Sequence, residues 1–76
     1  MSVTMELRIS YDPEADALYI KLKDDKVLKS EEAKEGVIVD LNKQGEIIGI
    51  EILNFSKSGI DLNEVIKRGV ETVMER

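Results

Sequence analysis

Apolar and polar residues alternate along the first part of the chain, which is the pattern of strands with one buried face. The alternation covers residues 5–11 and returns over residues 17–23. Between them, Asp12-Pro13-Glu14-Ala15 favours a turn, because proline presets the backbone angle φ and the Asp12 side chain accepts hydrogen bonds from following N–H groups. The two segments are therefore predicted to form a hairpin.

Two registers of this hairpin keep the apolar residues on one face. With Ile9 opposite Leu18, Glu6 lies beside Lys21, whereas a slip of two residues sets Arg8 beside Lys21. We predict the first register, because it places opposite charges together.

A second hairpin is predicted further along the chain. Residues 37–41 and 46–53 are rich in Val and Ile, and Asn42-Lys43-Gln44-Gly45 between them favours a turn. With Leu41 opposite Glu46, the apolar side chains of both strands share a face.

A helix is predicted from Leu62 to about Glu75. Asp61 and Glu64 have the spacing of a capping box, which satisfies the free N–H groups at a helix start. Apolar residues then recur at helical spacing, so the helix is amphipathic and packs on the sheet. Its apolar stripe is Leu62, Val65, Ile66, Gly69, Val70 and Val73. Gly69 on this stripe suggests a close approach to the sheet backbone.

Together these elements predict a single α+β domain over residues 1–76. We expect an antiparallel four-stranded β-meander, and residues 27–30 have room for a short extra edge strand. The C-terminal helix, about 62–75, covers one face. A chain of this length has a thin core, so a second subunit is a common source of added stability.

The amino-acid composition excludes several classes of catalytic site, metal site and partner. The chain has no Cys and no His, which removes disulfides, thiolate nucleophiles, Cys-based metal sites and imidazole general bases. Its net charge of −5 opposes a phosphate backbone and an anionic membrane. No apolar stretch approaches the roughly 18 residues of a membrane span. We therefore expect a cytoplasmic protein with no cofactor, no nucleic-acid partner and no membrane partner.

Three segments resemble the domain-of-unknown-function 2283 family (DUF2283). They are Tyr11-Asp12-Pro13-Glu14-Ala15-Asp16-Ala17-Leu18-Tyr19-Ile20, Gly36-Val37-Ile38-Val39-Asp40 and Gly49-Ile50-Glu51-Ile52-Leu53. The resemblance covers about residues 5–57. It implies a small prokaryotic domain of mostly antiparallel strands, and it implies no activity, cofactor or catalytic residue. The helix after Lys57 is predicted from its own cap and periodicity.

One cluster of acidic residues has a spacing that could serve a metal ion. Asp12, Glu14 and Asp16 recur at every second position and could direct carboxylates at calcium or magnesium. A calcium loop would need glycine where the chain has Ala17 and glutamate where it has Lys23. The favoured interpretation is that these acids cap a turn, so we predict no catalytic residue, cofactor site or metal site.

The sheet face opposite the helix is the predicted interaction surface. By alternation it holds Glu6, Arg8, Ser10, Ala17, Tyr19, Lys21, Ile38, Asp40, Ile47, Gly49, Glu51 and Leu53. Exposed apolar surface usually marks an interface, and here it consists of Tyr19, Ile38, Ile47 and Leu53. Gly49, expected opposite Ile38, leaves a gap. We predict a homodimer in which two such faces meet.

The function predicted from the sequence is therefore a non-enzymatic protein-interaction domain. It acts as a homo-oligomer or as an acidic partner of another protein, and the charge of −5 would steer a basic partner toward it. The alternative is a small carboxylate-based hydrolase or a protein that binds a divalent ion or another ligand. Ion binding separates the two classes.

Overall fold

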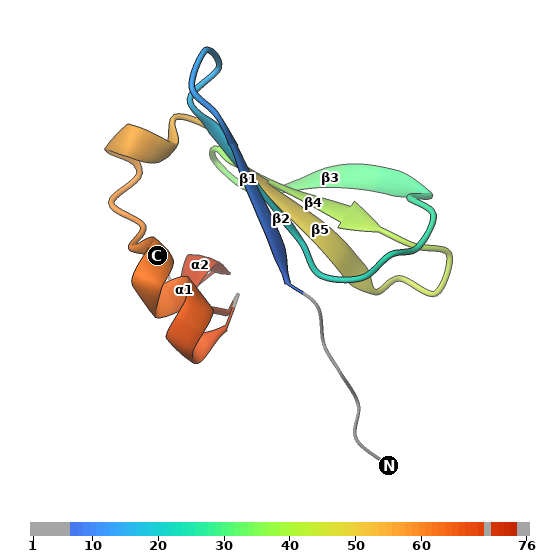
Figure 1. Ribbon diagram of the computed structural model, residues 1–76. Coiled ribbons are helices and arrows are strands. Elements are labelled where there is room, and N and C mark those ends of the chain that lie inside the picture. The colour runs from blue at the N-terminus through green and yellow to red at the C-terminus, as the bar shows by residue number, and fades with distance from the viewer. Residues whose placement is uncertain (1–6, 70, 75–76) are drawn as a thin grey trace.

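The computed structural model describes residues 7–69 and 71–74, which form one antiparallel sheet with short helices on one side (Figure 1). The elements are β1 (Arg8–Asp12), β2 (Ala17–Lys21), β3 (Lys29–Lys34), β4 (Val37–Leu41), β5 (Ile47–Ile52), the 3-10 helix η1 (Phe55–Lys57), α1 (Leu62–Arg68) and α2 (Glu71–Met74). The predicted α+β class is confirmed. The sheet has five strands rather than the predicted four. The fifth strand, β3, begins at Lys29 and overlaps only the end of residues 27–30, where the sequence left room for a short edge strand.

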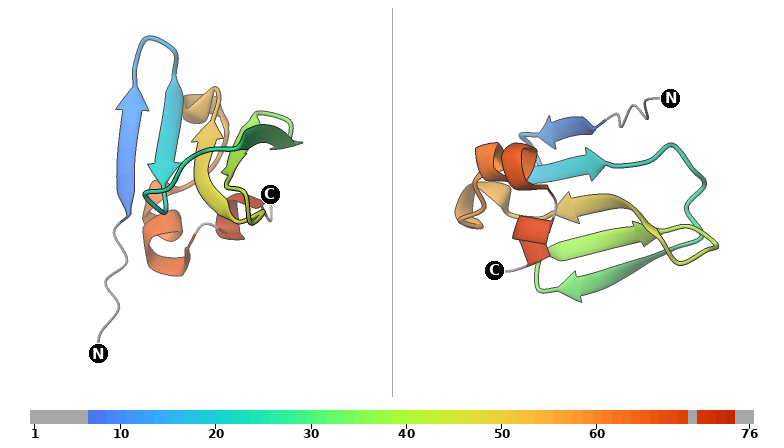
Figure 2. Two further views of the ribbon diagram at one scale, coloured as in Figure 1. Left: turned by 90° about the vertical axis from the view of Figure 1, so that its right-hand side faces the viewer. Right: turned by 90° about the horizontal axis from the view of Figure 1, so that it is seen from below.

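The strand order is β1-β2-β5-β4-β3, so the fold is not a simple meander. The last strand, β5, lies in the centre and pairs with both β2 and β4. The connection from β2 to β3 crosses one end of β5 and β4, as the left panel of Figure 2 shows. It is fastened there by the Leu28 N–H, which donates a 2.7 Å hydrogen bond to the Leu41 carbonyl.

The first hairpin has the register that we did not predict. Arg8 lies opposite Lys21, and Ile9 lies opposite Ile20. The turn decides this pairing, because its last residue, Asp16, takes a left-handed backbone with φ of 52° and sets Asp12 opposite Ala17. The geometry of a short turn therefore outweighs one attractive charge pair.

The rest of the predicted first hairpin involves residues before β1 and the charge of Lys21. Met5 and Glu6, placed in the first strand by alternation, lie outside the described residues. The Lys21 ammonium group lies 3.1 Å from the Asp24 carboxylate, so its charge has a partner three residues along the chain.

The second hairpin also differs in register. Leu41 lies opposite Ile47 rather than Glu46, and an irregularity between Asp40 and Leu41 precedes regular pairing with the rest of β5. The turn is one residue longer than predicted, because β5 begins at Ile47 rather than Glu46. The Asn42 N–H donates a 3.1 Å hydrogen bond to the Glu46 carbonyl within this turn. The extra residue in β5 makes a β-bulge, and alternation along the strand does not extend through it.

The core lies between the sheet and the helices. Val65 of α1 and Val73 of α2 are buried against side chains from β2, β4 and β5. These sheet residues are Leu18, Ile20, Val37, Val39, Ile50 and Ile52. In both panels of Figure 2 the helices occupy the same side of the sheet, so one sheet face packs and the other does not.

The C-terminal region is two short helices rather than one long helix. Asp61 caps α1 as predicted, because its carboxylate accepts a 2.9 Å hydrogen bond from the Asn63 N–H. Gly69 ends α1 with a φ of 91°, a conformation that favours glycine. A Cβ at Gly69 would meet nothing within 4 Å, so the predicted close approach to the sheet is wrong.

The buried side of the C-terminal helices therefore differs from the predicted apolar stripe. Ile66 is 56% exposed, so it does not belong to the buried side of α1. Val70 and Glu75, which belonged to the predicted helix, lie outside the described residues. Within the described residues, no helix is both long enough and apolar enough to cross a membrane.

Candidate functional site

The side of the sheet that faces away from the helices is the candidate site, and we call it the open face. Cross-strand pairing places its residues in rows that run over all five strands. One row is Arg8, Lys21, Gly49, Asp40 and Ser30, and the next is Ser10, Tyr19, Glu51, Ile38 and Glu32. The predicted assignment of Tyr19, Ile38 and Glu51 to one face agrees with this pairing.

Tyr19 dominates the centre of the open face. Its side chain extends from β2 across β5 at Gly49, and its hydroxyl donates a 2.7 Å hydrogen bond to Asp40 Oδ2 on β4. A Cβ at position 49 would lie 2.9 Å from Tyr19 Cζ and 3.0 Å from Asp40 Oδ2. The glycine therefore provides the space in which the aromatic ring lies, rather than the empty gap that we predicted.

Asp40 joins the tyrosine to the edge of the sheet. Its second oxygen, Oδ1, accepts a 2.6 Å hydrogen bond from the Ser30 hydroxyl on β3. The chain Tyr19–Asp40–Ser30 thus ties β2, β4 and β3 together across the open face. Hydrogen-bonded side chains on such a face hold their rotamers, which lowers the entropy lost when a partner binds.

Tyr19 is not prepared for proton transfer near neutral pH. Burial, the hydrogen bond to Asp40 and the nearby charges of Asp40 and Glu51 raise the pKa of Tyr19 to about 12. A general acid or base works best when its pKa is near the working pH. The hydroxyl is therefore a stable hydrogen-bond donor.

Charge on the open face is unevenly distributed. The cations Arg8 and Lys21 lie on β1 and β2, whereas the anions Glu51, Asp40 and Glu32 lie on β5, β4 and β3. Asp12, at the hairpin tip, is the exception. The face therefore has a basic side and an acidic side.

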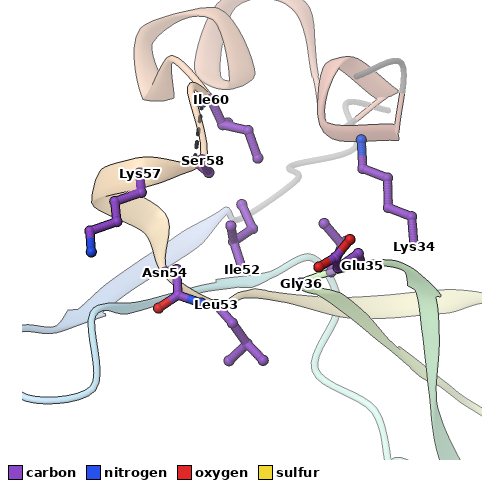
Figure 3. A pocket seen from close by; sticks show the side chains of 10 residues that line it. Lys34, Glu35, Gly36, Ile52, Leu53, Asn54, Lys57, Ser58 and Ile60 are labelled. Atoms are coloured by element: carbon purple, nitrogen blue, oxygen red, sulfur yellow. Dashed lines mark hydrogen bonds between the residues drawn. The ribbon is translucent and has the colours of Figure 1, made fainter.

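Apolar side chains lie between these charges. Ile38 is half-buried between Glu51 and Glu32, and Leu53 is 37% exposed. Figure 3 shows the Leu53 side chain pointing to the side of the sheet opposite Ile52 and Ile60. Ile47 is 41% exposed, but the bulge sets it opposite Leu41 and out of the row of Gly49. Tyr19, Ile38 and Leu53 thus form the apolar part of the open face.

The acidic residues proposed for a metal do not converge as ligands. Asp12 Oδ1 accepts hydrogen bonds from the N–H groups of Glu14 and Ala15 at 3.0 and 3.4 Å, which is the geometry of a capped turn. Asp16 is directed toward Ser56, whose hydroxyl donates a 2.6 Å hydrogen bond to it. In residues 7–69 and 71–74, no group of three or more acidic side chains has the geometry to hold a metal ion.

Asp16 has a structural role that the sequence did not reveal. It accepts hydrogen bonds from the Ser56 hydroxyl and N–H and from the Tyr11 hydroxyl, and these donors lower its pKa, Ser56 most and Tyr11 next. Its backbone carbonyl also accepts a 2.9 Å hydrogen bond from the Phe55 N–H. The tip of the first hairpin is thereby fastened to η1.

Asn42 also has a structural role that the sequence did not reveal. The residue is only 2% exposed. Its Oδ1 accepts hydrogen bonds from the N–H groups of Gln44 and Glu46 at 3.0 and 2.9 Å. Its Nδ2 donates to Glu46 Oε1 at 2.8 Å and to Asp25 Oδ2 at 3.0 Å. Asn42 thus holds the turn between β4 and β5 and fastens the crossing connection to it.

A pocket of about 460 Å³ lies between the turn from β3 to β4 and the segment after β5 (Figure 3). Val37 and Ile52 contribute buried apolar surface, and Lys34 and Lys57 are among its lining residues. Figure 3 shows the two ammonium groups far apart, with that of Lys57 pointing away from the other labelled side chains. These two ammonium groups therefore do not converge on one point of the pocket.

Comparison with known protein families gives a match over the sheet. Residues 8–56 match the family described as "Protein of unknown function (DUF2283)", in agreement with the resemblance carried by the sequence. The match covers the five strands and ends within η1. No curated protein and no solved structure matches the chain.

Proposed function

Because the chain belongs to the DUF2283 family, whose description assigns no activity, we propose a function from the geometry of the sheet. The protein is a non-enzymatic protein-interaction module whose open face binds the open face of a second copy of the chain. The observation that carries this proposal is the Tyr19–Asp40 hydrogen bond across Gly49, which presents an ordered aromatic ring on the same side of the sheet as Ile38, facing away from the helices.

The composition of this surface suits an interface. Tyrosine is enriched at the centre of protein interfaces, because it provides apolar area and a hydrogen-bonding hydroxyl at low entropic cost. Ile38 and Leu53 add apolar surface on the same side, and a partner would remove it from water. Two sheets commonly pack face to face, with their strands roughly aligned.

The charge distribution specifies how two copies would meet. A twofold axis that runs along the strands, between β2 and β5, places β1 of one copy over β4 of the other. Arg8 then faces Asp40 of the second copy, and Tyr19 faces Glu51 of the second copy. A twofold axis perpendicular to the strands would set like charges together, so the first arrangement is favoured.

The test compares the mass of the assembly in solution for three forms of the full chain. Ile38→Lys combined with Leu53→Lys places two charges in the proposed interface, and the ammonium group introduced on β4 can still pair with Glu51 and Glu32 in a single chain. Ile66→Lys, at a 56% exposed position on the helical side, is the matched control. Circular dichroism verifies that each variant is folded.

The wild type and the Ile66→Lys control should have at least twice the mass of one chain by light scattering. The double variant should have a lower mass than both. A wild-type mass of a single chain at high protein concentration, or an unchanged mass in the folded double variant, contradicts the proposal.

The alternative classes have weaker support. A carboxylate-based hydrolase or an ion-binding protein would need free, converging carboxylates, and Asp12 and Asp16 are occupied by neighbouring donors. An acidic partner for a basic protein is supported by the net charge of −5 and by the exposed Glu31 and Glu32 of β3. Binding to a basic polypeptide such as polylysine that is abolished by Glu31→Lys with Glu32→Lys would favour this second function.

A further inference from the structure

The two edges of the sheet are not equally protected against pairing with another strand. β3 forms one edge, and four of its six residues are charged: Lys29, Glu31, Glu32 and Lys34. It also has an irregularity between Glu32 and Lys34. Edge charges and bulges are the usual means by which proteins prevent edge-to-edge association. The β3 edge is therefore protected.

β1 forms the other edge and lacks these features. Its charges are confined to the two ends, Arg8 and Asp12, and Ile9, Ser10 and Tyr11 lie between them. It contains no proline or lysine, and its pairing with β2 is regular throughout. Tyr11 is 46% exposed although it lies on the helix-facing side of the sheet. Within residues 7–69 and 71–74, no strand pairs with the outer side of β1, and Tyr11 at this edge is an incompletely covered aromatic ring.

The order of residues in β1 is self-complementary when the strand is reversed. In an antiparallel pair centred on Ser10, Arg8 of one copy lies opposite Asp12 of the other, and Ile9 lies opposite Tyr11. We propose that β1 pairs in this register with β1 of a second copy, which joins two five-stranded sheets through their edges. The occupant of this edge is thus the same chain, related by a twofold axis normal to the sheet.

Other pairings of the same edge are less favourable. A parallel arrangement sets Arg8 beside Arg8 and Asp12 beside Asp12 of the second copy, and like charges directly opposite each other are destabilising. An antiparallel slip of two residues removes both Arg8–Asp12 pairs. In the proposed register, Ile9 of the second copy also covers the exposed side of Tyr11, whose ring contacts Phe55 at a centroid distance of 6.1 Å.

The β1 edge is a second contact surface, separate from the open face. Its pairing with a second copy does not depend on the proposed function. The open-face arrangement places β1 over β4 of the other copy, so it does not bring two β1 strands together. An assembly that uses both surfaces would exceed the mass of two chains. Loss of the open-face contact would leave edge-paired dimers.

A single cysteine tests the register directly, because the full chain has no Cys and any disulfide must link two chains. Directly opposed residues of antiparallel strands have Cα atoms about 4.5 to 5.5 Å apart, within the span of a disulfide. Ser10→Cys should therefore form a disulfide-linked dimer in a glutathione redox buffer at low protein concentration. Ser30→Cys, an exposed serine on the β3 edge, is the matched control and should remain largely monomeric on a non-reducing gel.

Two further variants exclude accidental crosslinking. Circular dichroism verifies that each is folded, because Asp12 also caps the turn after β1. Arg8 also faces Asp40 of the second copy in the open-face arrangement, so both variants are made in the Ile38→Lys, Leu53→Lys background. There Arg8→Asp and Asp12→Arg each place like charges in the proposed pair, and each should weaken self-association about tenfold or more. An equimolar mixture of the two variants restores both attractive pairs, so hetero-association should exceed that of either variant alone in sedimentation experiments.

The crosslinking is repeated in the Ile38→Lys, Leu53→Lys background, which removes the open-face contact. Edge pairing predicts that Ser10→Cys still crosslinks there, whatever the fate of the open-face dimer. Equal crosslinking of the Ser10→Cys and Ser30→Cys chains, or no preferential association in the mixture, would overturn the edge pairing while leaving the open-face proposal to its own test.

Discussion

The Tyr19 side chain passes over the backbone of Gly49, and its hydroxyl donates a hydrogen bond to Asp40. A residue on β2 is thereby hydrogen-bonded to a residue on β4 across the intervening strand, β5. Glycine in the middle of a strand usually weakens it, because the residue adds no side chain to pack. Here the tyrosine ring supplies that packing. The stability of the centre of the sheet and the shape of the open face therefore depend on the same two residues.

Gly49→Ala should destabilise the fold, because the added Cβ would lie within 3.0 Å of Tyr19 Cζ. Overpacking of this kind costs about 1 to 3 kcal/mol of the free energy of unfolding. Urea denaturation followed by circular dichroism measures the loss. In a Tyr19→Ala background the same substitution should cost much less, and equal costs in both backgrounds would show that the ring does not occupy the space above Gly49.

Tyr19→Phe should remove the hydrogen bond to Asp40 while keeping the ring. The expected loss is about 1 kcal/mol at neutral pH, since Asp40 retains the Ser30 donor. The pKa of Tyr19 is raised from 10.0 to about 12 in the folded chain, so its contribution is fully present below pH 10 and is lost as the pH rises toward 12.

The stability difference between wild type and Tyr19→Phe should therefore shrink over that range of pH. Tyr11→Phe is the control, because the pKa of Tyr11 is also raised, first by its hydrogen bond to Asp16. Phenolate absorbance in the two single variants distinguishes the two titrations. A Tyr19 that ionises at the ordinary pKa of a tyrosine would contradict the assigned contact.

Asp16→Asn should weaken the attachment of the first hairpin to η1. The Ser56 and Tyr11 donors lower the pKa of Asp16 from 3.8, so its contribution is present above pH 3.8 and is lost as the pH falls through the lower folded value. Asparagine tolerates the left-handed backbone at this position, where φ is 52°. The variant should be less stable than wild type at neutral pH and should show a flatter acid dependence in thermal melts; parallel acid profiles would argue against the attachment.

Asn42→Ala should be among the most costly polar substitutions in the described part of the chain. It leaves the N–H groups of Gln44 and Glu46 without their side-chain acceptor, and it detaches Asp25 from the turn. A loss of about 1 to 3 kcal/mol is expected, because Asn42 is buried and its partners lose their hydrogen bonds. Gln44→Ala, at an exposed position in the same turn, should change the stability little when both are measured by urea denaturation.

The sequence determined the elements that depend on local pattern. Alternation located β1, β2, β4 and β5 and assigned Tyr19, Ile38 and Glu51 to one face, because side chains on a strand point to opposite sides at successive residues. The helix start at Asp61 was equally predictable, since a capping side chain acts on N–H groups only two or three residues away.

Only the tertiary structure decided which strands meet and in which register. A slip of two residues leaves every side chain on the same face, so alternation alone cannot distinguish Arg8 opposite Lys21 from the predicted pairing. The left-handed backbone of Asp16 and the turn held by the Asn42 side chain set the register in the two hairpins, and the alternation of apolar residues encodes neither. The insertion of β5 between β2 and β4 then placed Gly49 beneath Tyr19, which joined distant residues into one surface.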